Sequence, residues 1–363
     1  MNDRSFNFKV YVHVEPNHSF SSCILTSLSS LFSDLSVKHT EHPFPVIIDT
    51  DCDLDDMMAI VYLVKNPRAE VKGVTTVGDG LSRWEYGAQN VLNVLELIGH
   101  PRVPVSYGAR ESLSPVGSYP PNWRQQADAL SGIKLPRSSV RPIAEKAPEF
   151  IIDIVQKHEE KITLLCIGPL TNIALAFEKK PEIKDKIERI FIMGGALLSP
   201  GNIEGRPMGF KNRVSEYNIF LDAKAAQDVF DSGVPITLVP IDVIEHVPTK
   251  PFYEMIAENR KTPAANFVYE ILKPSVKNKK RTREYLWDPV SAVLLTNPNS
   301  AQYRDLKLVV NLRKGPEYGR LIMGSKGMPV RVVTQIDTDA FYDIFLKTLN
   351  HPPNMHANHS QAL

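Results

Sequence analysis

The stretch PVIIDTDCDLDD, residues 45–56, joins an apolar segment to five aspartates within eight residues. Its apolar start predicts a buried strand, and residues 57–65 predict a helix directly after it. Carboxylates this close repel one another unless a cation or buried hydrogen bonds offset their charge. Ligands of α/β sheets bind beyond the carboxyl ends of strands, so the run predicts an oxygen-rich site for a hard divalent cation. The alternative is a solvated acidic loop in which one aspartate caps the helix.

The rest of the chain alternates predicted strands and helices from about residue 43 to 350. Continuous apolar runs separated by helices indicate a parallel sheet that is covered on both faces. The late segments are separated by short turns, which predicts antiparallel pairing. The expected fold class is therefore α/β, with a mostly parallel central sheet, helices on both faces and a small antiparallel extension. Strands are expected at 46–49, 71–77, 162–167, 187–193, 236–240, 306–312, 320–324 and 330–335, and helices at 56–65, 83–98, 170–177 and 337–349.

The domain organisation expected is one folded domain, 43–350, between an N-terminal extension and a C-terminal tail. Residues 1–42 contain a Ser-rich, mildly apolar segment and are expected to be poorly ordered. Residues 351–363 are rich in His, Pro and Asn and are expected to form a loose tail. Two long segments rich in Pro, Gly, Ser and Asn, 106–142 and 197–216, are expected to be binding loops or lids.

Composition narrows the class of protein. The 363 residues are 43% apolar and 23% charged, as in an ordinary soluble globular protein, and the net charge of +1 gives no reason to expect nucleic acid or an anionic membrane as a partner. Three cysteines without CxxC spacing argue against a disulfide framework and a zinc site. With no apolar stretch of membrane-spanning length, the expected location is cytoplasmic, or secreted or periplasmic if the N-terminal segment is a signal.

Polar turns follow the predicted strands and recur further along the chain. Each turn alone has an ordinary structural explanation, but turns at the ends of parallel strands converge on one edge of the sheet. Together they therefore predict one cleft. The turns are Asp49–Asp56, Gly78-Asp79-Gly80, Gly168-Pro169-Leu170-Thr171-Asn172, Met193-Gly194-Gly195, Gly201-Asn202, Ser215-Glu216-Tyr217-Asn218 and Trp287-Asp288-Pro289.

This combination resembles the inosine–uridine nucleoside hydrolase family, the nucleoside N-ribohydrolases, over about residues 45–350. The family's DxDxxxDD opening is matched by residues 49–56, its PLTN turn by 169–172, its MGG…GN…E-N segment by 193–218, and its late aspartate by Asp288. The resemblance implies a Rossmann-like nucleoside hydrolase fold. It also implies Ca²⁺-dependent hydrolysis of ribonucleosides to ribose and free base, in nucleoside catabolism and purine salvage. A homo-oligomer, dimer or tetramer, is expected on the same ground.

The resemblance also assigns roles to residues. In the family one Ca²⁺ binds the attacking water and the ribose 2′- and 3′-hydroxyls. The implied ligands are Asp51, Asp56, Asp288 and the backbone carbonyl of Ile167, with Asp51 also the general base. Asp55 is expected to bind the 2′-hydroxyl, and Asp49 to support the loop. The residues expected to hold the 3′- and 5′-hydroxyls are Asn202, Glu216 and Asn218.

The position before the late aspartate bears on substrate preference. Non-specific and pyrimidine-preferring members often have a proton-donating His there, whereas this chain has Trp287. The sequence PPNWR, residues 120–124, resembles the loop that supplies a second tryptophan, Trp123, in the purine-preferring inosine–adenosine–guanosine type. A purine between two indoles takes up a proton at N7 without an enzymic acid, so the resemblance implies purine preference. The alternative is that Trp123 and Trp287 only fill the core.

Two departures from the family pattern concern the substrate site. An ungapped alignment places Gly80 where the family has Asn or Asp, so Asp79 either reaches the ribose through a shifted loop or the contact is lost. Asp53 stands where the family often has Gly or Asn, and it has no assigned role. The competing functions are a broad or pyrimidine-acting ribohydrolase and a non-catalytic nucleoside-binding relative. A phosphatase with a similar DxD start is disfavoured because its later Lys and acidic pair are missing.

Overall fold

The computed structural model describes residues 42–114, 116–205, 207–209, 211–277 and 286–352. The expectations for the N-terminal extension up to residue 41, and for the tail from residue 353, lie outside the described residues. The proposed limits of the catalytic domain therefore stay a prediction.

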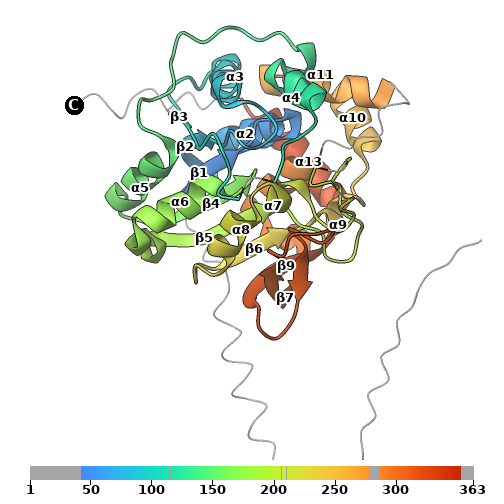
Figure 1. The fold of residues 1–363 in the computed structure, drawn as a ribbon. Coiled ribbons are helices and arrows are strands. Elements are labelled where there is room, and N and C mark those ends of the chain that lie inside the picture. Colours follow the sequence, from blue (N-terminus) through green and yellow to red (C-terminus); the bar gives the residue numbers. More distant parts are fainter. Residues whose placement is uncertain (1–41, 115, 206, 210, 278–285, 353–363) are drawn as a thin grey trace, which may run out of the picture. The chain divides into compact units, whose positions relative to one another are not determined.

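The described residues form one nine-stranded sheet (Figure 1). Neighbouring strands follow the order β3-β2-β1-β4-β5-β6-β9-β7-β8, parallel from β3 through β9, with β7 antiparallel to both β9 and β8. The predicted α/β class and the antiparallel extension are confirmed, and β9 joins the extension to the parallel sheet. The strands are β1 (Phe44–Thr50), β2 (Ala69–Thr76), β3 (Val105–Tyr107), β4 (Ile162–Ile167), β5 (Ile187–Met193), β6 (Ile236–Val239), β7 (Ala301–Val310), β8 (Leu321–Met323) and β9 (Met328–Ile336).

Both faces of the central strands are buried under helices, which explains why these strands are apolar without alternation. In β1, Val46 and Ile48 belong to one hydrophobic cluster, whereas Ile47 belongs to the cluster on the opposite face. Each such side chain stabilises the fold by about 1.5–3 kcal/mol when fully buried. The first cluster lies under α2 (Leu54–Lys65), α3 (Trp84–Leu97), α10 (Thr249–Glu258), α11 (Pro263–Lys277), α12 (Trp287–Thr296) and α13 (Thr338–Leu349), and the second under α5 (Ala147–Lys157), α6 (Thr171–Lys179) and α8 (Ala223–Phe230).

Several elements were not predicted. The segment 106–142, expected to be a loop, contains the end of β3, the helix α4 (Pro121–Asp128) and a 3₁₀ turn (Leu130–Gly132). Proline at the first position of α4 has the backbone angle that a helix start requires, so PPNWR opens a helix. Asp288, expected in a polar turn, instead lies in the first turn of α12. The remaining short elements are α7 (Tyr217–Leu221), α9 (Ile241–Ile244) and the 3₁₀ helices Pro181–Lys186 and Pro298–Ser300.

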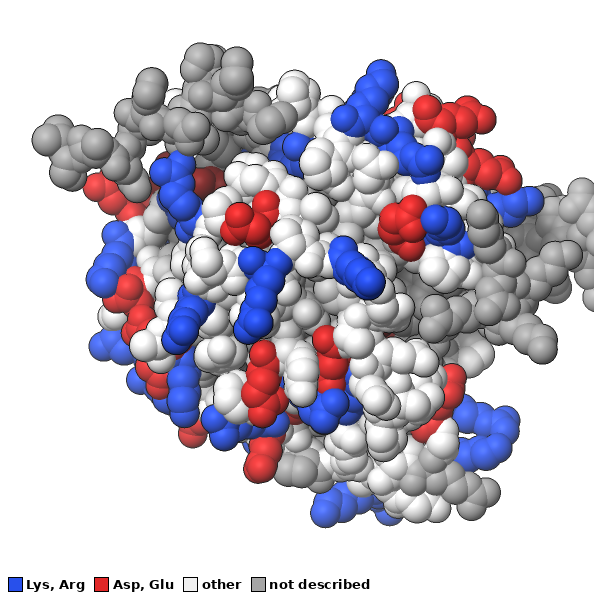
Figure 2. Space-filling view, turned by 90° about the horizontal axis from the view of Figure 1, so that it is seen from above, with Lys and Arg blue, Asp and Glu red and all other residues white. Residues whose placement is uncertain are grey.

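The surface agrees with the near-zero net charge. Figure 2 shows a face on which basic and acidic side chains are interspersed. Over the described part of the chain, no helix is long and apolar enough to cross a membrane.

Candidate active site

A cavity of about 420 Å³ lies beyond the carboxyl ends of β1, β4 and β5. It brings together every residue predicted to contact the metal or the substrate except Asp79. The lining also contains residues that were not predicted, and they come from loops and helices far apart in the sequence. The cavity is lined by Asp51, Asp53, Asp55, Asp56, Leu81, Tyr119, Trp123, Ile167, Met193, Gly201, Asn202, Ile203, Glu204, Glu216, Tyr217, Asn218, Glu245, Trp287 and Asp288.

The aspartate loop turns sharply between β1 and α2. Cys52 has a φ of 67°, in the left-handed region that residues other than glycine rarely adopt. Its side chain is buried, and burial raises the pKa of the thiol well above its usual value. Asp53 and Asp56 then form a capping box at the start of α2, in which the Asp53 amide donates to Asp56 Oδ2 at 3.0 Å. Asp53, without an assigned role from the sequence, therefore starts the helix that carries Asp55 and Asp56.

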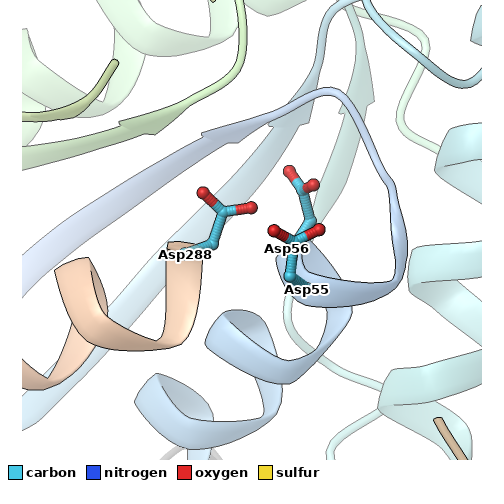
Figure 3. A group of neighbouring side chains, drawn as sticks. All are labelled: Asp55, Asp56 and Asp288. Atoms are coloured by element: carbon cyan, nitrogen blue, oxygen red, sulfur yellow. The ribbon is translucent and has the colours of Figure 1, made fainter. Parts of the chain in front are cut away.

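Asp55, Asp56 and Asp288 form a buried carboxylate cluster. Figure 3 shows Asp288, from α12, facing the pair from α2. One carboxylate oxygen from each lies within 4.8 Å of the others. Oxygens on a single Ca²⁺ lie about 2.3–2.6 Å from the ion, and therefore up to about 5 Å apart. The spacing and the all-oxygen donor set thus fit one hard divalent cation.

The electrostatics of this cluster also favour a bound cation. Burial, followed by the charges of Asp55, Asp56 and Asp51, raises the pKa of Asp288 well above its usual value. Burial likewise raises the pKa values of Asp55 and Asp56. Asp56 also accepts hydrogen bonds from the Thr50 hydroxyl and from the Asp51 amide at 3.2 Å. A bound cation would offset the repulsion that opposes ionisation of these groups.

Asp51 lies in the same cavity, against the turn that follows β2. The Leu81 amide donates to Asp51 Oδ2 at 2.8 Å, and the Ser82 amide donates to the Asp51 carbonyl at 2.9 Å. Gly80 leaves room for this contact, because a Cβ there would lie 2.1 Å from the Asp51 Cβ. The Asn or Asp that the family carries at this position would clash in this chain. Burial and then Asp56 raise the pKa of Asp51.

The polar wall of the cavity is built around the start of α7. Glu216 caps this helix, and its carboxylate accepts from the amides of Gly195 and Asn218, both at 2.9 Å. The Asn218 side-chain amide donates to the Met193 carbonyl at 3.1 Å. Asn202 Oδ1 accepts from the Tyr217 amide at 3.0 Å, so the two loops are tied together.

Aromatic side chains form the remainder of the lining. Trp123, on α4, lies 6.3 Å from Tyr119 and 6.1 Å from Tyr217, measured between ring centroids, and Tyr119 stacks on Tyr217 at 4.1 Å. Trp287 lines the same cavity from the start of α12. Tyr217 lies inside the Glu-Tyr-Asn motif and was accessible to sequence reasoning. Tyr119 and Glu245 carried no local signal and reach the cavity only through tertiary packing.

Asp79 and Asp49 lie behind the cavity. Asp79 is absent from the lining, and its Oδ2 contacts the Thr171 hydroxyl at 2.8 Å. Asp49 accepts from Thr75 at 2.5 Å and from Asn172 at 2.7 Å, in keeping with the supporting role expected for it. Burial raises the pKa of each of these two carboxyl groups to about 7. The structure therefore does not bring Asp79 to the place where a ribose contact was expected.

The fold and the cavity define an α/β enzyme with a carboxylate cluster suited to a metal ion at the edge of its sheet. The model of the inosine-uridine preferring nucleoside hydrolase family matches residues 46–343. The chain belongs to this family and is a hydrolase of N-glycosyl compounds, with nucleosides as its substrates.

Relatives within the family differ in the base that their names specify. Uridine nucleosidase 1 of Arabidopsis thaliana is 32% identical over 277 residues, which cover 75% of this chain and 78% of the relative. The structure of a plant nucleoside hydrolase, the PpNRh1 enzyme, has a TM-score of 0.74 and 27% identity, covering 85% of this chain and all of that one (100%). A purine-preferring ribonucleoside hydrolase from Gardnerella vaginalis has a TM-score of 0.71 and 27% identity, covering 84% and 98%.

Proposed function

We propose that this enzyme is a Ca²⁺-dependent ribonucleoside hydrolase that prefers purine nucleosides. The observation that carries the proposal is the joint placement of the cluster Asp55, Asp56 and Asp288 with Trp123 and Trp287 in one cavity. The cluster suits the ribose end of a nucleoside, and the indoles suit its base. Base–aromatic stacking contributes about 1–3 kcal/mol per base in related settings.

From the family resemblance we infer Asp51, Asp56, Asp288 and the Ile167 carbonyl as the metal ligands. The carboxylates grouped in the structure are Asp55, Asp56 and Asp288, so the structure supports two of these ligands and the choice of Asp51 rests on the resemblance. A divalent cation held there supplies positive charge that favours ionisation of water and binding of the ribose hydroxyls. Asp51 takes the proton of the attacking water, since its Oδ2 is already held by the Leu81 amide and the other oxygen remains for the reaction. The oxocarbenium-like ribosyl state of glycoside hydrolysis is stabilised by the surrounding carboxylates.

The ribose is held by residues on both sides of the cluster. Asp55 is assigned to the 2′-hydroxyl. Glu216, Asn218 and Asn202 are assigned to the 3′- and 5′-hydroxyls. Glu216 Oε1 accepts one backbone hydrogen bond and keeps a second lone pair for a hydroxyl. Asn202 uses its oxygen for Tyr217, which leaves its amide nitrogen as the donor.

The base leaves without a histidine donor at the position before Asp288, where this chain has Trp287. Stacking favours proton uptake at the purine N7, which makes the departing base neutral. The second candidate is a hydrolase that acts broadly or on pyrimidine nucleosides, and the Arabidopsis uridine nucleosidase, at 32% identity, favours it. We also infer from family membership a homo-oligomer, dimer or tetramer, which size-exclusion chromatography with light scattering would measure.

The deciding experiment measures release of free base from inosine, adenosine and uridine, with and without a chelator. We expect the highest kcat/KM for the purine nucleosides and loss of all activity on removal of Ca²⁺. Equal kcat/KM values for inosine and uridine would refute the stacking argument. Activity that survives thorough chelation would refute the metal assignment.

A further inference from the structure

The Thr171 hydroxyl lies between two buried carboxyl groups that contribute nothing to the cavity lining. Its Oγ1 is 2.8 Å from Asp79 Oδ2 and 2.9 Å from Asp222 Oδ2. A hydroxyl has one proton and can donate to only one of these oxygens. The second contact is a hydrogen bond only if the other carboxyl group donates. One of the two aspartates must therefore carry a proton.

Asp222 is the carboxylate of the pair. Its Oδ2 also accepts from the Leu113 amide at 2.6 Å, and its Oδ1 accepts from the Ser114 hydroxyl at 3.0 Å and the Ala225 amide at 3.1 Å. Several donors to one carboxyl group stabilise its ionised form. Asp79, in contrast, has a buried Oδ1 with no hydrogen-bond partner among the described residues. The proton is therefore on Asp79, which donates to Thr171 while Thr171 donates to Asp222.

Asp79 belongs to the turn that positions Asp51. Two residues beyond Asp79, the Leu81 amide holds the Asp51 carboxylate, and the Ser82 amide holds the Asp51 carbonyl. Arg124 supports the other side of the turn by donating to the carbonyls of Gly78, at 2.8 Å, and Leu81, at 3.3 Å. Asp79 is thus the side chain that ties this turn to α6 in the core.

We propose that Asp79 is a positioning residue that acts as a neutral carboxylic acid, donating its proton to Thr171 and thereby holding the turn that orients Asp51. It touches no substrate. The charged groups around it are Asp222 at the N-cap of α8, Asp49 on β1, and Asp51 and Arg124 at the turn. When Asp79 ionises, two carboxylates compete for one hydroxyl proton and repel each other, so the turn loses its attachment.

The sign of the pH dependence follows from the raised pKa of Asp79, about 7 in the folded chain against the usual 3.8, caused mainly by burial. The stability that the Asp79 proton contributes is complete below the usual pKa of an aspartate. It is lost as the pH rises through the higher pKa that Asp79 has in the folded chain. Asp79→Asn should keep the hydrogen bond, because an amide also donates, and should remove the titration. Asp79→Ala should lose the bond at every pH.

The test compares the full-length enzyme with Asp79→Asn, Asp79→Ala and Asp79→Asn/Thr171→Val, using inosine turnover from about pH 6 to pH 9. We expect the kcat of the wild type to fall at least about tenfold between the acid and the alkaline end of this range. Asp79→Asn should lose this alkaline decrease. Asp79→Ala should be at least about tenfold slower than the wild type already at the acid end. The double variant should lose the rescue. Equal losses in Asp79→Asn and Asp79→Ala with a raised KM, or an unchanged alkaline decrease in Asp79→Asn, would overturn the proposal.

Thermal unfolding tests this inference independently of the proposed function. Only the turnover measurement rests on the proposed function. The Tm of Asp79→Asn relative to the wild type should rise from about pH 5 to pH 8, since only the wild type loses stability there. A Tm difference that stays flat or falls over this interval would show that Asp79 is already ionised, and the inference would be wrong. Failure to release base from any nucleoside would instead overturn the proposed function and leave the Tm comparison valid.

Discussion

Gly80→Ala should displace Asp51 and slow the enzyme severely while leaving the fold in place. An ideal Cβ at position 80 lies 2.1 Å from the Asp51 Cβ and 2.6 Å from its Oδ2. Carbon atoms in contact are about 3.5–4.0 Å apart, so the Asp51 side chain or the turn must move by more than about 1 Å. A misplacement of about 1 Å can cost about 10²-fold in rate, which is about 2.7 kcal/mol of transition-state stabilisation.

The assay is inosine hydrolysis, with kcat and KM measured separately and Tm measured on the same samples. The loss of activity should appear in kcat. Asp51, the proposed general base, has moved, whereas the aromatic side chains that stack on the nucleobase have not. Gly324→Ala is the matched control, since no heavy atom lies within 4 Å of a Cβ at that position. It should keep wild-type kinetics and Tm.

The clash can also be tested without activity. Overpacking costs about 1–3 kcal/mol, and removing the atoms that collide should recover it. Gly80→Ala/Asp51→Gly, which removes the colliding Asp51 Cβ together with its carboxylate, should therefore regain most of the Tm lost by Gly80→Ala, although it stays inactive. A folded Gly80→Ala enzyme with kcat within about threefold of wild type would show that Asp51 does not depend on this contact for its position.

Three further outcomes follow from the site. Dialysis against a chelator should abolish inosine hydrolysis and lower Tm. Ca²⁺ at about 100 times its Kd should then restore about 2.7 kcal/mol of stability. An unchanged Tm after dialysis would refute a cation at the carboxylate cluster. Trp287→Ala should reduce kcat/KM for inosine about 5–100-fold and affect uridine less, and an unchanged rate with inosine would refute its stacking role. Arg124→Lys keeps the charge but loses the two-pronged contact with the Gly78 and Leu81 carbonyls. At about 1 kcal/mol per hydrogen bond it should lower kcat about 5–30-fold, and wild-type kcat would show that the turn does not need Arg124.

Local sequence patterns were sufficient to predict the bounds of two central strands. The predicted strands at 162–167 and 187–193 coincide with β4 and β5, because each run is mostly apolar and is followed directly by a turn signal, Gly168-Pro169 or Gly194-Gly195. Helix α4 was missed because its composition is polar and rich in Pro and Gln, so no apolar period marks it. Asp288 lines the cavity, but it lies in the first turn of α12 and not in the polar turn that was expected.

The sequence by itself determined the class of fold, the family and most of the side chains expected at the edge of the sheet. It could do so because buried parallel strands and carboxylate-rich turns leave local patterns in the chain. Only the tertiary structure decided which of these side chains line the cavity and which support it from behind. It placed Asp79 behind the cavity and Asp51 against Gly80, and it brought Tyr119 and Glu245 into the lining. Contacts between distant segments depend on how helices pack across the sheet, and no spacing within the chain records that packing.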